Sequence, residues 1–376
     1  MLIMSSSVFG FSPLCAEETN SNYENLIARR MWQGIPGIEI TPNGRMFFTF
    51  SAGTTNERTF EYMTILCYSD DYGRTHSPLR FMAPPKDGSR GFDAVPWIDP
   101  NGRLWYLFNR QSRTTGQYGV YARICEDPDA EEPVFGPEFR VGFDVPCSFS
   151  LNKPTVLSTG EWIMPVTYSN EPVFRWNTAQ NPQLQGVAIS HDDGKTWQLH
   201  GAVNAPHWAL EGMIVELKDG RLWMLIRTGK DFLWESFSTD KGITWSESTK
   251  SKIRNPSSRF YIRRLASGNL LMVNHATSKS RNNLRAQISV DDGKTWSKGL
   301  LLDARLPVSY PDGVQDKDGN IWIIYDFDRK DRGTDESTHG QILIARFREE
   351  DALSGRDVSK TVVIRYIISS LSKKRG

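Results

Sequence analysis

The chain has 376 residues, of which 39% are hydrophobic and 24% are charged, and its formal net charge is +1. This nearly neutral charge gives no sign of a basic surface that would bind nucleic acid or an anionic membrane. The sequence has no G-x-x-x-x-G-K-[ST], C-x-x-C or H-E-x-x-H motif, so phosphate-loop, redox and zinc chemistry lack support and no cofactor or metal is expected.

The N-terminal segment resembles a degraded or truncated export signal. Residues 1–16 are apolar and turn polar at Glu17, but the positively charged start of a signal peptide is missing. The alternatives are a disordered leader or a misplaced start codon. We expect residues 1–20 to be a leader and the protein to be secreted or periplasmic. Three cysteines remain after such a leader, an odd number with no recognisable spacing, so no disulfide framework is expected.

A turn containing glycine, followed by a short apolar strand, occurs six times. The strands are expected at 46–50, 104–108, 162–166, 222–226, 270–273 and 321–325. The turn glycines are Gly44, Gly102, Gly160, Gly220, Gly268 and Gly319, at intervals of 58, 58, 60, 48 and 51 residues. This spacing predicts one all-β domain over residues 24–350, a six-bladed β-propeller with four-stranded antiparallel blades. The repeat overrides the two or three domains that length alone suggests.

A second repeat, S-x-D-x-G-x-T-W, is the Asp-box. It occurs at 190–197, 238–245 and 289–296, and a copy at 69–76 lacks only the final Trp. In each copy the Asp carboxylate is expected to cap N–H groups of its own loop, with the Gly at positive φ and the Trp packed under the turn. The copies fall between the Gly-turn strands, so we expect them to join the outer strands of blades and to be structural.

The C-terminal part carries two more apolar segments, 342–347 and 361–368. Residues 351–376 are expected to form a C-terminal strand and tail. A propeller must avoid open strand edges, so we expect one of these strands to pair with N-terminal residues and close the ring. No stretch reaches the roughly 20 apolar residues that span a bilayer.

Three segments between the repeats resemble the sialidase (neuraminidase) superfamily, over essentially the full propeller. They are residues 208–227, which place Glu211 sixteen residues before Arg227; residues 280–284, which carry Arg281; and residues 309–326, which place Tyr310 sixteen residues before Asp326. The resemblance implies that Tyr310 is a nucleophile activated by Glu211, and that Arg227 and Arg281 grip a substrate carboxylate. Asp326 stands where the family usually has Glu and would help to hold an arginine.

The chemistry of sialic acids explains this combination. They are ketosides with a carboxylate on the anomeric carbon, which repels a carboxylate nucleophile, so this class uses Tyr. A phenol with a pKa near ~10 needs a base in contact, and a planar guanidinium grips a carboxylate through paired hydrogen bonds. Each residue also has a structural interpretation. Glu211 could cap a strand turn, Tyr310 could be a floor aromatic, and Arg227 could pair with Asp231.

The chain departs from the family pattern in the first blade. The family motif Arg-Ile-Pro, whose Arg is the first of three carboxylate-binding arginines, reads Gly34-Ile35-Pro36 here. One of the three grips is therefore lost, unless Arg58 or Arg90 supplies it from a neighbouring loop, and common sialosides are expected to be poor substrates. Trp32 and Gln33 are expected to line the vacated space, Trp32 by stacking on the sugar and Gln33 through neutral hydrogen bonds.

The acid/base residue of the family is an Asp ahead of the first Asp-box. Glu57 is the nearest acidic residue here, with Glu61 second, and Asp93 resembles a pocket Asp of the second blade. The sequence therefore favours an exo-glycosidase that hydrolyses a terminal acidic sugar, sialic acid or a related residue, from a glycan substrate. The alternatives are a glycan-binding propeller that lost turnover and a protein-interaction propeller. Nothing in the sequence indicates an oligomeric state.

Overall fold

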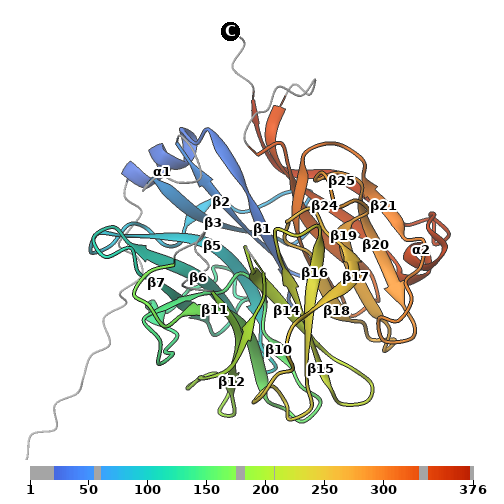
Figure 1. Ribbon diagram of the computed structural model, residues 1–376. Coiled ribbons are helices and arrows are strands. Elements are labelled where there is room, and N and C mark those ends of the chain that lie inside the picture. Colours follow the sequence, from blue (N-terminus) through green and yellow to red (C-terminus); the bar gives the residue numbers. More distant parts are fainter. Residues whose placement is uncertain (1–20, 55–60, 175–182, 207, 330–337, 373–376) are drawn as a thin grey trace, which may run out of the picture.

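The computed structural model describes residues 21–54, 61–174, 183–206, 208–329 and 338–372. Six antiparallel sheets, each built from consecutive strands, surround a central axis (Figure 1), which confirms the six-bladed all-β propeller. The first three blades contain β1 (Trp32–Ile40), β2 (Met46–Gly53), β3 (Tyr62–Ser69) and β4 (Arg80–Phe81); β5 (Ser89–Ile98), β6 (Leu104–Ser112), β7 (Tyr118–Cys125) and β8 (Phe139–Arg140); and β9 (Cys147–Phe149), β10 (Thr155–Val156), β11 (Trp162–Ser169), β12 (Leu184–Ser190) and β13 (Gln198–Asn204).

The other three blades follow the same order from inner to outer strand. They contain β14 (Leu210–Glu216), β15 (Leu222–Arg227), β16 (Phe232–Ser238) and β17 (Thr249–Arg254); β18 (Tyr261–Arg264), β19 (Leu270–His275), β20 (Leu284–Ser289) and β21 (Leu300–Asp303); and β22 (Val308–Gln315), β23 (Ile321–Phe327), β24 (Thr338–Phe347) and β25 (Val363–Ser372). Two short helices, α1 (Ser21–Ala28) and α2 (Glu349–Ser354), lie outside the blades. Neither is long and apolar enough to cross a membrane, nor is any other helix in the described part of the chain.

The third blade departs from the predicted four strands because its inner strand is interrupted. Both β9 and β10 pair with β11, so this sheet has five strands. Pro154 stands just before β10 and has no backbone N–H to give to the ladder. The interruption leaves Asn152 and Lys153, both buried, free of the regular pleat and close to the axis.

The six glycine turns join the first two strands of each blade, as predicted. Their glycines have φ between 82° and 99°, in the left-handed region that a Cβ disfavours. The four Asp-boxes follow β3, β12, β16 and β20, and so join the two outer strands of their blades. Because β-strands alternate in direction within a blade, the glycine turns and the Asp-boxes lie at the same end of the propeller.

The Asp-boxes have the predicted internal hydrogen bonds. In the copy at 289–296, Asp291 accepts hydrogen bonds from Ser289 Oγ at 2.8 Å, from Thr295 N–H at 2.8 Å and from Thr295 Oγ1 at 2.6 Å. In two copies the Trp also bonds the turn, since Trp197 Nε1 donates to the Gly194 carbonyl at 3.1 Å and Trp245 Nε1 to the Gly242 carbonyl at 2.9 Å. Each box is therefore stabilised by its own side chains.

The boxes also hold neighbouring blades together. Three hydrogen bonds join the box of one blade to the glycine turn of the blade before it: Arg103 Nη2 to Asp193 O at 2.9 Å, Lys241 Nζ to Glu161 Oε1 at 2.9 Å, and Lys218 N to Asp292 Oδ2 at 2.6 Å. In a fourth contact, Tyr72 of the first box stacks on Trp322 at the start of β23, with ring centres 5.7 Å apart. The last of these joins the sixth blade to the first. The boxes thus connect neighbouring blades to one another at the glycine-turn end of the propeller.

The prediction that a C-terminal strand pairs with N-terminal residues is wrong. β24 pairs with β23 and with β25, so both C-terminal strands belong to the sixth blade. The propeller therefore extends beyond residue 350, and β25 is its outermost strand rather than a separate tail. Side chains close the ring instead: Gln33 Nε2 donates to the Gly340 carbonyl at 2.7 Å and to Ser369 Oγ at 2.9 Å.

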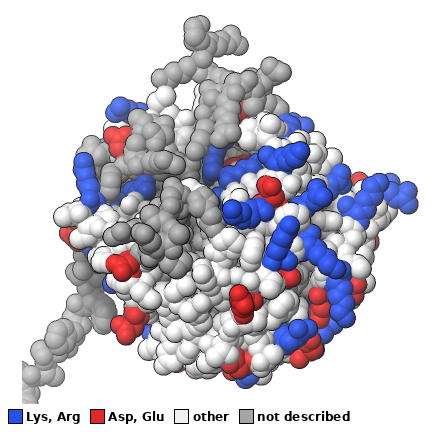
Figure 2. Space-filling model, in the orientation of Figure 1, with Lys and Arg blue, Asp and Glu red and all other residues white. Residues whose placement is uncertain are grey.

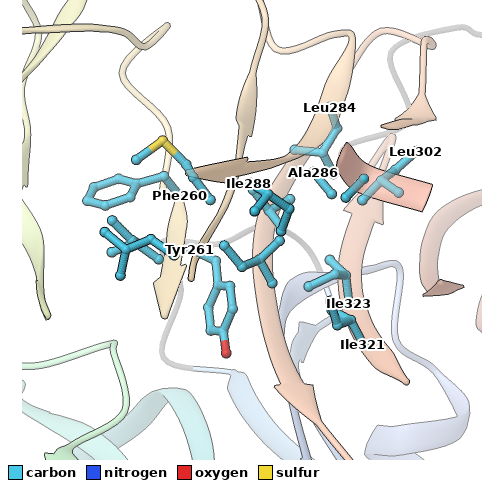
Figure 3. Close-up of a cluster of buried hydrophobic side chains, with 14 of the residues drawn as sticks. Phe260, Tyr261, Leu284, Ala286, Ile288, Leu302, Ile321 and Ile323 are labelled. Atoms are coloured by element: carbon cyan, nitrogen blue, oxygen red, sulfur yellow. The ribbon is translucent and has the colours of Figure 1, made fainter. Parts of the chain in front are cut away.

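The hydrophobic core lies between adjacent blades. Along β20 the buried residues Leu284, Ala286 and Ile288 alternate with half-buried polar ones, as a strand with one core face requires. Figure 3 shows their side chains between those of Phe260 and Tyr261 on one side and those of β23 on the other. On the surface, Lys and Arg are more frequent toward the right-hand edge of the face in Figure 2, with Asp and Glu among them. The low net charge is thus spread as mixed charges.

We expect the Asp-boxes to make the fold sensitive to acid. Hydrogen bonds from the Thr75 and Thr196 groups lower the pKa of Asp71 and Asp192 to about 2, and hydrogen bonds from Thr295 do the same for Asp291. A folded pKa below the unfolded value near ~3.8 adds stability above about pH 4, and this gain disappears as the pH falls to about 2.

Urea unfolding of wild type and Asp291→Asn between pH 2 and pH 6 tests this. Asn keeps the size of the side chain but not its charge, so the variant should be less stable at pH 6. The two proteins should converge near pH 2. A stability gap of constant size across this range would contradict the electrostatic account.

Candidate functional site

The inner strands of four blades carry a β-bulge at the end opposite the glycine turns. The bulges fall between Gly34 and Gly37, Phe92 and Val95, Leu210 and Met213, and Ser309 and Asp312. Each contains one residue in the left-handed region: Ile35 (φ 57°), Asp93 (φ 50°), Glu211 (φ 55°) and Tyr310 (φ 56°). Such a conformation is costly for a residue with a Cβ, and it gathers at functional sites where a bulge re-aims a side chain. Three of the four are predicted site residues.

Tyr310 and Glu211 meet on the axis, as the sequence predicts. The Tyr310 hydroxyl donates to Glu211 Oε1 at 3.2 Å, although the two residues come from β22 and β14. Arg227 from β15 joins them, since its Nη1 donates to Glu211 Oε2 at 2.6 Å and to the Tyr310 hydroxyl at 2.9 Å. All three side chains are buried. The phenol therefore lies between a carboxylate and a guanidinium.

The electrostatics of this group favour a protonated Tyr310 phenol next to a carboxylate that can accept its proton. Burial raises the pKa of Tyr310 above its ordinary value near 10, and the positive charge of Arg227 opposes this shift. For Arg227, burial disfavours the charge, but the interactions with Glu211 and Tyr310 together outweigh it, so the pKa of Arg227 is raised. Near neutral pH the phenol keeps its proton and the guanidinium keeps its charge. Removal of the phenolic proton then needs an adjacent acceptor, which Glu211 supplies.

Three guanidinium groups surround the Tyr310 ring. Their Cζ atoms lie 5.8 Å (Arg227), 5.5 Å (Arg281) and 4.5 Å (Arg329) from the ring centre. Arg281 is held by a 2.7 Å hydrogen bond from its Nη2 to the Ser257 carbonyl. Arg227 and Arg281 converge as predicted, whereas Arg329 was not expected from the sequence. The signal that could have revealed it is an arginine three residues after Asp326.

Asp326 connects the sixth blade to the first. Its Oδ2 accepts a 2.8 Å hydrogen bond from the Ile35 N–H, and its Oδ1 accepts one from Ser309 Oγ at 2.7 Å. Arg329 Nη1 lies 3.7 Å from the same Oδ2. Asp326 therefore fixes the bulge of β1 and pairs with an arginine, and that arginine is Arg329.

Trp32 and Gln33 do not line the space beside Gly34, contrary to prediction. Trp32 is only 2% exposed and packs edge-on against Tyr62, within a buried cluster that includes Tyr310. The Gln33 amide is engaged with Gly340 in the closing seam and is fully buried. Both residues are therefore packing residues of β1.

The second blade brings Asp93 toward the same end. Asp93 accepts a hydrogen bond from the Tyr62 hydroxyl. Arg90, one candidate for the missing grip, instead has its Cζ 5.2 Å from the ring centres of Tyr62 and Phe92, and it donates to Gln111 at 2.8 Å. It is thus held between the first and second blades.

The first-blade acid/base candidates are less defined. Glu57, and with it the other grip candidate Arg58, lies outside the described residues. Glu61 is exposed at the start of the third strand and accepts a hydrogen bond from Thr54. Asp93 is therefore the described acidic candidate that is closest to the aromatic cluster around Tyr310.

A buried polar network lies on the axis and supports the Glu211 bulge. Asn152 Nδ2 donates to the carbonyls of Glu211 and Gly212 at 3.0 and 2.9 Å, and Arg259 Nε donates to Asn152 Oδ1 at 2.7 Å. Sequence reasoning missed this network. Its one local signal was Pro154, which interrupts the inner strand of the third blade.

A second candidate site can be set aside. A cavity of about 600 Å³ opens at the glycine-turn end, with Asp99, Lys218 and Arg264 among its lining residues. Asp99 is bound by Arg103 at 2.7 Å, and Arg264 is paired with Asp292 at 3.0 Å. These charges are paired within their own blades, and the cavity lies at the end opposite the bulges. Among the described residues, no three His, Cys, Asp or Glu side chains are grouped as metal ligands.

The chain is similar to known proteins in the region that builds this site. Residues 145–323, which include Glu211, Arg227, Arg281 and Tyr310, match the family model of the BNR repeat-like domain. A sialidase from Bacteroides fragilis is 31% identical over 130 residues, which are 31% of this chain and 24% of that protein. This chain is thus an Asp-box propeller that is similar to sialidases in this region.

Solved structures of superfamily members have the same fold. The Hadza microbial sialidase Hz136 superposes with a TM-score of 0.67 at 18% identity, covering 80% of this chain and 64% of that one. The intramolecular trans-sialidase from Ruminococcus gnavus superposes with a TM-score of 0.62 at 13% identity, covering 87% and 96%. The chain spans about a quarter of the Bacteroides sialidase and under two thirds of Hz136. Likeness at this identity establishes the propeller fold alone, and the function has to be argued from the side chains of the site.

Proposed function

We propose that this chain is an exo-glycosidase that removes a terminal acidic sugar, sialic acid or a related residue, from a glycan. The observation that carries the proposal is the buried contact of the Tyr310 hydroxyl with Glu211 and Arg227. A tyrosine beside a carboxylate base, under several arginines, suits a glycoside whose own carboxylate repels an acidic nucleophile.

In the proposed first step the Tyr310 oxygen attacks the anomeric carbon while Glu211 takes the phenolic proton. The bond from that carbon to the leaving glycan breaks as the new C–O bond forms, and an acidic group protonates the leaving oxygen. Glu57, Glu61 and Asp93 are the candidates for this acid. In the second step water attacks the anomeric carbon and gives a proton to the acidic group of the first step, the Tyr310–carbon bond breaks, and Glu211 returns the proton to the phenolate. Two displacements give net retention.

The arginines supply the preference for an anionic sugar. Arg281 lies beside Tyr310, and a planar guanidinium can hold both oxygens of a carboxylate, which an ammonium group cannot. We expect Arg281→Lys to keep the positive charge but to weaken turnover of acidic glycosides by roughly one to two decades, because charged hydrogen bonds contribute roughly 1.5–3 kcal/mol.

The test is to incubate wild type and Arg281→Lys with a panel of acidic and neutral glycans and to identify the released monosaccharides. Wild type should release an acidic sugar, and the variant should lose that activity selectively. Release of neutral sugars alone, equal in both proteins, would contradict the anionic substrate.

A glycan-binding propeller without turnover is the second candidate, because Gly34 replaces the first arginine of the superfamily. It predicts binding of acidic glycans by wild type with no released sugar. We also propose that the protein is secreted or periplasmic. This rests on the apolar sequence of residues 1–16, which lie outside the described residues.

A further inference from the structure

The place of the missing first-blade arginine is filled from the sixth blade. A Cβ at Gly34 would lie 2.6 Å from Arg329 Cδ, and 3.0 Å from both Arg329 Cβ and Asp326 Oδ2. Gly34 does not have a left-handed backbone, so its lack of a side chain meets a need for space rather than for an unusual φ. The Arg329 stem crosses the position where a first-blade side chain would begin.

Arg329 reaches the same target that such an arginine would reach. Its Cζ is 4.5 Å from the Tyr310 ring centre, nearer than the Cζ of Arg227 or Arg281. Its contact with Asp326 at 3.7 Å ties it to the carboxylate that also fixes the β1 bulge. Arg329 is 9% exposed, so most of its stem is buried.

The charged side chains around Tyr310 favour the binding of an anion. Glu211 faces Arg227 and Asp326 faces Arg329, while Arg281 is bonded to an uncharged carbonyl. Burial lowers the pKa of Arg281, and the positive charges of Arg227 and Arg329 lower it further. A carboxylate placed among the three guanidinium groups would relieve this repulsion.

We propose that Arg329 is the third carboxylate-binding arginine of this site, supplied from the sixth blade, and that Gly34 is small because Arg329 passes over it. The proposal rests on the proposed function for its choice of an acidic sugar as ligand. It changes the expected specificity: the anion site has three guanidinium groups after all, so a sialic acid carboxylate should be bound in spite of Gly34.

The first test needs no activity. Gly34→Ala, Arg329→Ala and the double variant are compared by urea unfolding. The alanine methyl at residue 34 collides with the Arg329 stem, so Gly34→Ala should destabilise wild type clearly and the Arg329→Ala background much less. Equal effects in both backgrounds would overturn the packing relation.

The second test measures binding of N-acetylneuraminic acid by calorimetry, with N-acetylglucosamine as the neutral probe. Arg329→Ala should weaken binding of the acid about 10- to 100-fold. The matched control is Arg346→Ala, which removes an arginine of the same blade that lies over Trp322, and it should bind like wild type. Gly34→Arg combined with Arg329→Ala should recover most of the affinity, whereas Gly34→Arg alone should not increase it.

The outcomes separate this inference from the proposed hydrolysis. Arg329-dependent binding of the acid without any released sugar supports the arginine and contradicts the exo-glycosidase. Released acidic sugar at an equal rate and affinity in Arg329→Ala supports the enzyme and overturns the role of Arg329. Failure of wild type to bind the acid at all also overturns that role.

Discussion

Tyr310→Phe is expected to reduce turnover of acidic glycosides by roughly a thousandfold or more, since loss of a nucleophile removes the step on which the other groups act. Phe keeps the ring in the buried cluster and under the three arginines, so binding of an acidic sugar should change little. The initial rate of sugar release from the acidic glycan, and the calorimetric affinity for the acidic sugar, would be measured on the same protein preparations. The expected result is a loss in kcat with a small change in affinity.

A matched control is Tyr168→Phe. The Tyr168 hydroxyl also donates one hydrogen bond, to the Gly201 carbonyl at 2.8 Å, but it belongs to the third blade and to a separate part of the core. Tyr168→Phe should lose about 1 kcal/mol of stability and Tyr310→Phe about twice that, because the Tyr168 hydroxyl makes one hydrogen bond and the Tyr310 hydroxyl makes two. Only Tyr310→Phe should lose turnover. Equal turnover in the two variants would show that the phenol is a packing residue and would favour the glycan-binding alternative.

The features that the sequence predicted correctly are those with a local cause. A glycine turn needs a left-handed backbone and an Asp-box needs its own Ser, Asp and Thr, so both can be recognised within eight residues. Their spacing then gave the number of blades. The spacing from Glu211 to Arg227 follows from one hairpin, β14–β15, and could be recognised in the same way.

The features that were missed depend on contacts between distant segments. Gly34 was interpreted as a lost grip because nothing near it in the sequence points to Arg329, which reaches it only after the ring has closed. Gln33 was assigned to the substrate because its amide could bond a sugar, yet the closing seam uses that amide for Gly340. Strand pairing at the closure was mispredicted for a similar reason, since β25 had an equally suitable partner in β24.

The axial network also depends on distant segments, and its removal should have the largest effect on stability. Lys153 Nζ lies 3.2 Å from Glu39 and 3.3 Å from Asp312, donates to the Gly313 carbonyl at 3.0 Å and contacts the Ile38 carbonyl. It therefore joins the third blade to the first and the sixth. Its side chain is 2% exposed, so water cannot replace what it supplies.

Lys153→Met keeps most of the length and apolar stem of the side chain but removes the ammonium group. Asp312 then still has Arg259 at 3.3 Å, whereas Glu39 loses the ammonium group that lay 3.2 Å away. Breaking a buried ion pair from one side costs about 3–5 kcal/mol, because the charge left behind stays desolvated. Urea unfolding should show a loss of this size.

Lys241→Met is the matched control, since it removes a lysine from an ion pair whose Nζ–Oε1 distance is 2.9 Å but whose lysine is 53% exposed. That loss should be at most about 1 kcal/mol, because water already solvates the pair. Equal stability of the two variants would mean that water reaches the charged groups on the axis and solvates them. A large loss confined to Lys153→Met would instead mean that a buried charge network holds the blades in the positions that bring Glu211 to Tyr310.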